Sequence, residues 1–171
     1  MKGRTPAVVL LAVVACAAQP PQDEFDGKPW EVLKTQLPSY PKPENMLRVH
    51  VSPPAAFDFF VDAASVSVGQ DAIVRYTLIA RSTSGAVNVS YEGIRCLPLE
   101  RKPYAFGGSD NAWSPVRTPQ WAPISRAQTN QQHAALAEDF FCPESRQVRT
   151  TEEAVQALRR GNTPGLGRYR E

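Results

Sequence analysis

The sequence has no apolar run long enough to cross a membrane as a helix. About 20 apolar residues are needed for a crossing, and the uncharged apolar run AVVLLAVVA at residues 7–15 has nine, or twelve when residues 16–18 are counted. The chain also lacks an excess of charge. It has 19 basic and 17 acidic residues, and 17 of each remain when Lys2 and Arg4 are left out. A nucleic-acid partner, which needs a concentrated basic face, is therefore not expected.

Motifs for catalysis and for cofactor binding are absent as well. The sequence contains no Gly-x-Ser-x-Gly elbow, phosphate-binding loop, Gly-x-Gly-x-x-Gly turn or Cys-x-x-Cys pair. Its two histidines, His50 and His133, are not next to a cysteine or a pair of carboxylates at metal-ligand spacing. We therefore predict no cofactor, no metal and no catalytic residue.

The amino-terminal segment has the pattern of an export signal. Lys2 and Arg4 precede the apolar run, which is too short for a membrane span but typical of a signal peptide. We predict a signal peptide at residues 1–15, followed by a flexible, proline-containing acidic spacer at residues 16–28. One globular domain follows at residues 29–161, with a flexible tail at residues 162–171.

Two cleavage sites fit this leader. Val13, Val14 and Ala15 before Cys16 form the pattern of a bacterial lipoprotein, in which the cysteine is acylated, whereas ordinary cleavage near residues 17–18 also obeys the small-x-small rule. We favour lipidation of Cys16. The residue after it is Ala17 and not the aspartate that retains such proteins at an inner membrane. We therefore expect an outer-membrane anchor with the domain on the periplasmic side.

The cysteine count agrees with export. If Cys16 is acylated or removed, Cys96 and Cys142 are left as an even pair, as an oxidising compartment favours. A disulfide between them would stabilise the domain by roughly 4 kcal/mol in the chain-entropy model. The alternative is two free, buried thiols.

Strand-length segments fill the middle of the chain. Alternating, branched or aromatic residues predict strands at residues 46–51, 57–61, 65–68, 72–80, 86–96, 97–106 and 111–116. A four-residue loop at residues 82–85 would pair Leu78 with Val89 on one face of a hairpin and Arg75 with Glu92 on the other. We predict a bulge at Gly93 that turns Cys96 toward the core.

Two helices are predicted after the strands. Ser125 and Gln128 form a capping box before an apolar stripe of His133, Leu136, Ala137 and Phe140, which ends at Pro143. A second box of Thr150 and Glu153 precedes a stripe of Val155 and Leu158, with Gly161 as the end cap. The fold class is therefore α+β: an antiparallel sheet with two carboxyl-terminal helices packed on it and one disulfide.

Two groups of side chains are candidate sites. Arg75 and Glu92 are a candidate ion pair, and a structural role is the favoured one. Tyr104, Trp113 and Trp121 lie in a loop-rich stretch and form a candidate aromatic surface for sugars or a partner protein. The competing interpretation, which we favour for these aromatic residues, is core filling beneath irregular backbone.

The central hairpin, VRYTLIARSTSGAVNVSYEGIRC at residues 74–96, resembles a known family. With Lys102-Pro103-Tyr104-Ala105, Trp113, Trp121 and Phe141-Cys142-Pro143, it is similar to the small exported proteins named after a cryptic neisserial protein. The resemblance covers most of residues 30–158. It implies an exported envelope protein of proteobacteria, supports the pairing of Cys96 with Cys142, and brings no catalytic residue to carry over.

Together these observations predict a non-enzymatic cell-envelope module that binds or scaffolds another envelope protein or a cell-wall component. The alternative is a small protein that binds or hydrolyses cell-wall glycan. In the hydrolase version the aromatic residues would hold the sugar and a carboxylate such as Glu92 would act as acid or base.

Overall fold

The structure is a computed structural model that describes residues 37–51, 56–125 and 131–161. The predicted signal peptide, Cys16, the spacer, the tail and Gln128 of the first capping box lie outside the described residues.

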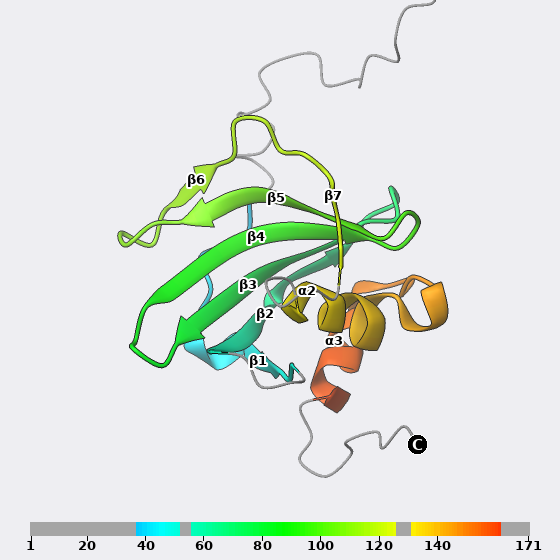
Figure 1. Cartoon of the computed structure of the whole chain (residues 1–171), viewed down its shortest axis with the longest axis horizontal. Helices are drawn as coiled ribbons and strands as arrows, with labels where there is room; N and C mark the ends of the chain where they lie inside the picture. Colours follow the sequence, from blue (N-terminus) through cyan, green and yellow to red (C-terminus); the bar gives the residue numbers. More distant parts are fainter. Residues whose placement is uncertain (1–36, 52–55, 126–130, 162–171) are drawn as a thin grey trace, which may run out of the picture.

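Within the described residues, seven strands form one antiparallel sheet, and the first six lie side by side in chain order (Figure 1). The order is β1-β2-β3-β4-β5-β6, and β7 pairs with β5 beside β6. A 3-10 turn, η1 (Pro43–Asn45), leads into the first strand. The strands are β1 (Met46–Val49), β2 (Phe57–Val68), β3 (Val74–Ser82), β4 (Val87–Arg95), β5 (Glu100–Gly107), β6 (Trp113–Pro115) and β7 (Ala122–Pro123).

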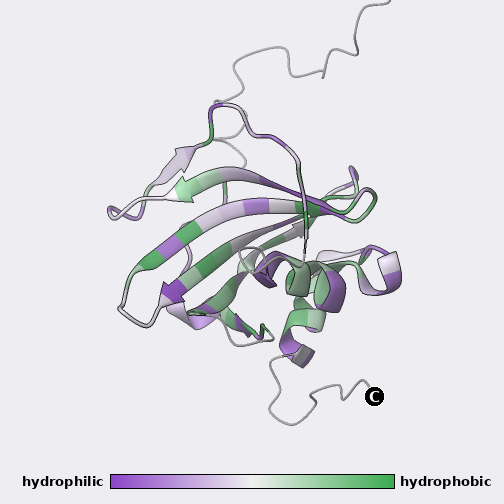
Figure 2. Cartoon of the chain, viewed as in Figure 1, coloured by the Kyte–Doolittle hydropathy of each residue, from purple (hydrophilic) through white to green (hydrophobic). Residues whose placement is uncertain are grey.

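Helical segments cover one face of this sheet (Figure 1). They are α2 (Gln131–Ala135), the π-helix η3 (Leu136–Phe141), the 3-10 turn η4 (Pro143–Ser145) and α3 (Thr151–Gly161). Figure 2 shows hydrophobic residues along the central strands and on the helices in front of them. The predicted α+β class, with helices on an antiparallel sheet and a disulfide, is confirmed.

The main core lies between the sheet and these helices. Tyr76, Ile94, Leu136, Phe141 and Leu158 are its largest fully buried apolar side chains. The predicted stripe of His133, Leu136, Ala137 and Phe140 is buried throughout. In the second helix, Leu158 is fully buried and Val155 packs against the core as predicted. Burial of apolar surface between the two layers is thus what holds the helices on the sheet.

The predicted hairpin register is wrong by one residue. Ile79 faces Val89 and Leu78 faces Ser90, so every predicted cross-strand pair is shifted. The Ser82 N–H donates to the Ala86 carbonyl at 2.8 Å, which leaves a three-residue loop in place of the predicted four. Gly85 ends this loop at φ 90°, a conformation that three-residue hairpin loops need and that glycine adopts without strain.

The sheet has two bulges, and neither lies at the predicted position, Gly93. The predicted strands at residues 57–61 and 65–68 are one strand, β2, with an irregularity between Asp62 and Ser67. There the Ser65 hydroxyl replaces a backbone partner, because it accepts from the Thr77 N–H at 2.8 Å. The pairing of β3 with β4 is regular through Gly93, and the second irregularity lies where β4 pairs with β5. Cys96 nevertheless faces the main core, as predicted.

The start of α3 is capped nearly as predicted. The Glu153 N–H donates to the Thr150 hydroxyl at 3.1 Å, and the Glu153 carboxylate accepts from the Arg149 N–H at 2.7 Å. The carboxylate thus binds the N–H one residue before the one that a standard capping box uses. At the other end of α3, Gly161 does not have a positive φ. Its missing side chain matters because a Cβ there would lie 2.3 Å from the Phe140 ring.

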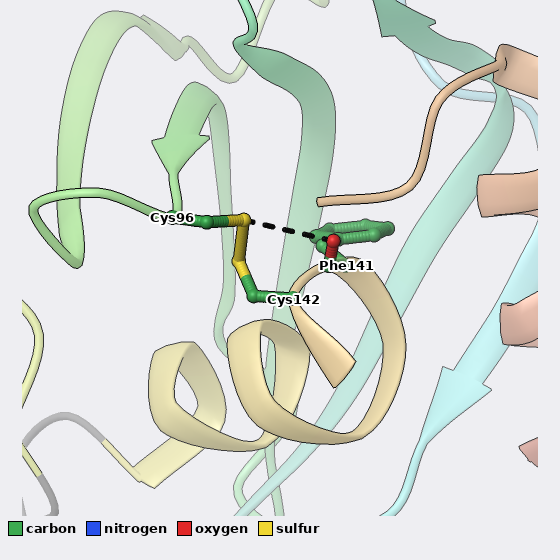
Figure 3. Close-up of a disulfide and its surroundings, with 3 residues drawn as sticks. All are labelled: Cys96, Phe141 and Cys142. Atoms are coloured by element: carbon green, nitrogen blue, oxygen red, sulfur yellow. Dashed lines mark hydrogen bonds between the residues drawn. A yellow bond between two sulfur atoms is a disulfide. The ribbon is translucent and has the colours of Figure 1, made fainter. Parts of the chain in front are cut away.

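A disulfide joins the end of β4 to the end of the first helical segment. Cys96 and Cys142 have Cα atoms 5.7 Å apart and are 46 residues apart in sequence. Figure 3 shows the bridge beside Phe141, whose carbonyl oxygen lies 3.7 Å from Cys96 Sγ. The predicted pairing is confirmed, and it fixes the helices to the sheet by a covalent bond.

Candidate ligand-binding groove

The one-residue shift separates the two members of the predicted ion pair. Arg75 is opposite Gly93, and Glu92 is opposite Tyr76, so Arg75 and Glu92 point to different faces of the sheet. The predicted Arg75–Glu92 pair is therefore wrong. Arg75 instead donates to Asp71, with Nη1 3.1 Å from Oδ1. This hydrogen bond and the positive charge of Arg75 lower the pKa of Asp71 below its usual value.

Glu92 is buried beneath α2, where three side chains donate to it. His133 Nε2 lies 2.7 Å from Oε2, the Tyr76 hydroxyl donates to the same oxygen at 3.2 Å, and the Ser90 hydroxyl donates to Oε1 at 2.7 Å. The side chains of Glu92 and His133 are each 5% exposed. We call these four residues the Glu92 cluster. They join β3 and β4 to the helix that covers them.

Two opposing effects set the protonation of the Glu92 cluster. Burial is the largest influence on Glu92 and would raise its pKa, but the hydrogen bond and attraction of His133 and the hydrogen bond of Ser90 lower the pKa below its usual value. Burial and the neighbouring carboxylate raise the pKa of Tyr76 well above its usual value, so its hydroxyl keeps its hydrogen. An ionised, fully bonded carboxylate that is sealed from solvent is suited to holding α2 on the sheet.

No direct sign of this cluster was present in the sequence, because Glu92 and His133 are 41 residues apart. Two weak signals were present. His133 is the one polar side chain in the apolar stripe of its helix, and Glu92 interrupts a strand that is otherwise largely buried. Polar residues on the buried faces of two packed elements indicate that they bind each other.

Tyr104 and Trp113 are used in packing on the opposite face of the sheet. Tyr104 is 7% exposed and forms a small second core with Tyr91 and Ala105, against which Trp113 packs. The Trp113 Nε1–H donates to the Pro38 carbonyl at 2.8 Å. These two of the three candidate aromatic residues thus anchor the amino-terminal segment of the domain.

Trp121, the third candidate aromatic residue, contacts two cations, and one of them, Lys102, also lies over the Tyr104 ring. The Arg95 guanidinium lies 4.4 Å and the Lys102 ammonium 4.7 Å from the centre of its ring. Arg95 also donates from Nε to Glu100 at 2.8 Å. Trp121 is half-buried, so part of its surface is open to solvent.

A groove of about 900 Å³ opens at the end of the sheet where β4 ends. Its walls come from four separate segments: the β2–β3 turn, the end of β4, the stretch from η4 to Arg149, and the start of α3 (Figure 1). The lining residues are Asp71, Ala72, Arg95, Cys96, Leu97, Pro143, Glu144, Ser145, Arg146, Gln147, Arg149 and Glu153. The disulfide therefore lies in the wall of the groove.

The backbone of this groove adopts an unusual conformation. In the described ranges, four residues other than glycine have a positive φ, and three of them line the groove: Ala72 at 56°, Glu144 at 53° and Ser145 at 62°. Such a conformation costs a side-chain-bearing residue about 1–2 kcal/mol. Strained backbone of this kind persists only where the surroundings enforce it, and it is enriched at binding sites.

In the parts of the chain that the structure describes, no helix has the length and apolar character needed to cross a membrane. The same residues contain no cluster of three or more His, Cys, Asp or Glu side chains that could hold a metal ion.

The structure defines a small α+β domain. Its antiparallel meander carries helices on one face, a disulfide joins the two layers, and a groove opens at one end of the sheet. Residues 25–159 match the CNP1-like family. The chain belongs to this family, and the resemblance seen in the hairpin sequence is confirmed. No curated protein and no solved structure matches the chain.

Proposed function

We propose that this chain is an exported, non-enzymatic binding module of the bacterial cell envelope, and that the groove is its binding surface. In this proposal the signal peptide is removed and Cys16 carries the lipid that anchors the domain to the outer membrane. The partner is another envelope protein or a cell-wall component. The disulfide supports export, because such bonds persist in oxidising compartments and are rare in the cytosol.

One observation carries the proposal: strained backbone is concentrated in a groove that is braced covalently. Ala72, Glu144 and Ser145 shape its walls, and the bond between Cys96 and Cys142 joins two of those walls. A preformed groove loses little conformational entropy when a ligand binds. The arrangement is thus favourable for recognition and has no evident advantage for packing alone.

The Glu92 cluster supports the non-enzymatic part of the proposal. The pairing of Glu92 with His133 resembles a general acid–base pair in composition, but both side chains are buried, and the lining residues of the groove include neither. A general base must come within hydrogen-bonding reach of the proton that it removes. Glu92 is covered by α2 and its oxygens are taken by protein donors, which argues against a hydrolase that uses it.

Site-specific photo-crosslinking tests the groove as a binding surface. A photoreactive residue would replace Gln147, which lines the groove, and in a matched control Gln156, which is exposed on α3 outside it. We expect crosslinked adducts with native envelope material from position 147 and few from position 156. Equal labelling from both positions would contradict the proposal.

The anchor has its own test. Radiolabelled palmitate should enter the wild-type protein in growing cells and should not enter a Cys16→Ser variant. Label in both proteins, or in neither, would remove lipidation from the proposal and leave the ordinary cleavage near residues 17–18.

Trp121 favours a second candidate function, the binding of cell-wall glycan. Its ring is half-buried and contacts Arg95, which also lines the groove, so a sugar stacked on Trp121 would lie near the groove. Soluble peptidoglycan fragments should then protect Trp121 from a fluorescence quencher, and a Trp121→Leu variant should lose that protection. Quenching that is unchanged by every fragment would count against this candidate.

A further inference from the structure

The charges that line the groove are almost all neutralised by protein groups. Asp71 is bonded to Arg75, and Arg95 to Glu100. Two of the lining residues pair with each other, since Arg146 Nη2 donates to the Glu144 carboxylate at 2.9 Å. None of these charges needs a counter-ion from a ligand.

The last two charges in the groove belong to Glu153 and Arg149. Glu153 uses its carboxylate to accept the backbone N–H of Arg149 at the start of α3, where a negative charge is also favoured by the helix dipole. The Arg149 guanidinium has no hydrogen bond or ion pair with any residue that the structure describes. Among the residues that the structure describes, Arg149 is therefore the one lining charge without a counter-charge or a bonded partner.

Uncharged groups next to Arg149 add a second kind of contact. The Gln147 amide likewise makes no hydrogen bond within the described ranges, and it offers both a donor and an acceptor. Leu97 is 80% exposed, the most exposed of the large hydrophobic residues that the structure describes, and together with Ala72 and Pro143 it gives the groove an apolar wall. A guanidinium, a free amide and an apolar wall together fit the end of a peptide: its carboxylate, its last amide and its side chains.

We infer that the groove binds a short peptide by its terminal carboxylate, which Arg149 receives. The inference rests on the proposed function, because it names the ligand class of the same groove. The planar guanidinium forms two parallel hydrogen bonds to a carboxylate, and such charge-assisted bonds are about twice as strong as neutral ones. Gln147 pairs with the last peptide group, and small apolar side chains of the peptide lie against Leu97.

Three synthetic peptides separate a terminal carboxylate from other anions. The first is N-acetyl-trialanine with a free carboxylate, the second is the same peptide with an amidated end, and the third is an amidated acetyl-Ala-Asp-Ala with its charge on a side chain. Each would be titrated into the ¹⁵N-labelled chain carrying Cys16→Ser, and backbone amide shifts at Ala72, Leu97 and Gln147 would be followed by NMR.

We expect the free-carboxylate peptide to shift the amides that line the groove and to bind at least about tenfold more tightly than either amidated peptide. Arg149→Gln should weaken its binding by about the same factor, because the guanidinium has no described partner whose loss would disturb the fold. Arg160→Gln, in the exposed last turn of α3, is the matched control and should bind as the wild type does.

The inference is overturned if the free-carboxylate peptide shifts no groove amide, if the three peptides bind alike, or if Arg149→Gln binds as tightly as Arg160→Gln. Photo-crosslinking tests the broader proposal separately. If position 147 captures envelope material while the peptides do not bind, the groove is still the binding surface and only the inferred specificity for a terminal carboxylate is wrong. If position 147 labels no more than position 156, the groove itself is not the binding surface.

Discussion

Removing His133 should lower the free energy of unfolding more at neutral pH than at acid pH. In the His133→Ala variant Glu92 loses its shortest contact on Oε2, the 2.7 Å bond, and keeps the Ser90 and Tyr76 donors. Both paired side chains are only 5% exposed, so water cannot replace the lost bond without entering the core. Leaving a buried carboxylate without one of its hydrogen-bond partners costs about 1–3 kcal/mol. We expect a loss in this range at pH 7.

The stabilisation that the Glu92 cluster provides depends on pH. The pKa of Glu92 lies below its ordinary value of 4.5 in the folded protein. Its contribution to stability is therefore fully present above pH 4.5 and is lost as the pH falls through the folded pKa. Without His133, burial is opposed by fewer favourable contacts and the folded pKa of Glu92 rises. The variant should therefore lose less stability at low pH than at pH 7, because burying a protonated carboxyl costs less free energy than burying a carboxylate.

Urea unfolding at pH 7 and at pH 4, followed by fluorescence of the three tryptophans, measures both effects. The double variant Glu92→Gln with His133→Ala should be more stable than His133→Ala alone at pH 7, since no buried charge is left without its partner. His50→Ala is the matched control: His50 is exposed, and its loss should change the free energy of unfolding by less than about 0.5 kcal/mol. A cost below about 1 kcal/mol for His133→Ala, or one that grows on acidification, would show that His133 does not stabilise the buried Glu92 carboxylate.

Three further variants test separate parts of the fold by urea unfolding. Replacing Cys96 and Cys142 together with serine opens a loop closed over a separation of 46 residues, and the chain-entropy model gives a loss of about 4 kcal/mol; unchanged stability would contradict it. Gly85→Ala should cost about 1–2 kcal/mol because φ is 90° there, although the site has open space for a methyl group; a neutral result would mean that the loop can relax. Gly161→Ala should gain up to about 1 kcal/mol from helix propensity but lose about 1–3 kcal/mol to the clash with Phe140, so a net gain in stability would show that the ring can move aside.

Strand and helix positions could be predicted from the sequence because they depend on local periodicity. β3 and β4 follow the alternation of residues 74–96, and the stripe of His133, Leu136 and Phe140 marks the buried face of its helix. The register could not be predicted, because loops of three and four residues both fit Ser82 to Gly85. A change of one residue in the loop shifts one strand along the other, so each side chain faces a different partner and the two strands' apolar residues are matched differently. The wrong prediction of an ion pair between Arg75 and Glu92 follows from this one-residue error in register alone.

The groove and the Glu92 cluster could not be predicted because long-range contacts create them. The lining residues Asp71, Arg95 and Arg149 come from segments that only the complete fold brings together. Ala72, Glu144 and Ser145 have no sequence signature of a positive φ, since alanine and serine rarely adopt it and only tertiary structure enforces it. The disulfide was the one long-range contact open to prediction, because the cysteine count leaves a single pair.

We propose that the groove is where this domain meets its partner in the envelope. Leu97 and Val87 allow a matched comparison, because both are exposed apolar residues, 80% and 50%, and only Leu97 lines the groove. The measurement is the affinity of the purified chain for isolated native envelopes by co-sedimentation, with Cys16→Ser in every protein so that the lipid plays no part. We predict that Leu97→Asp weakens this binding at least about tenfold, and that Val87→Asp leaves it unchanged. Equal binding by both variants and the parent protein would contradict the claim.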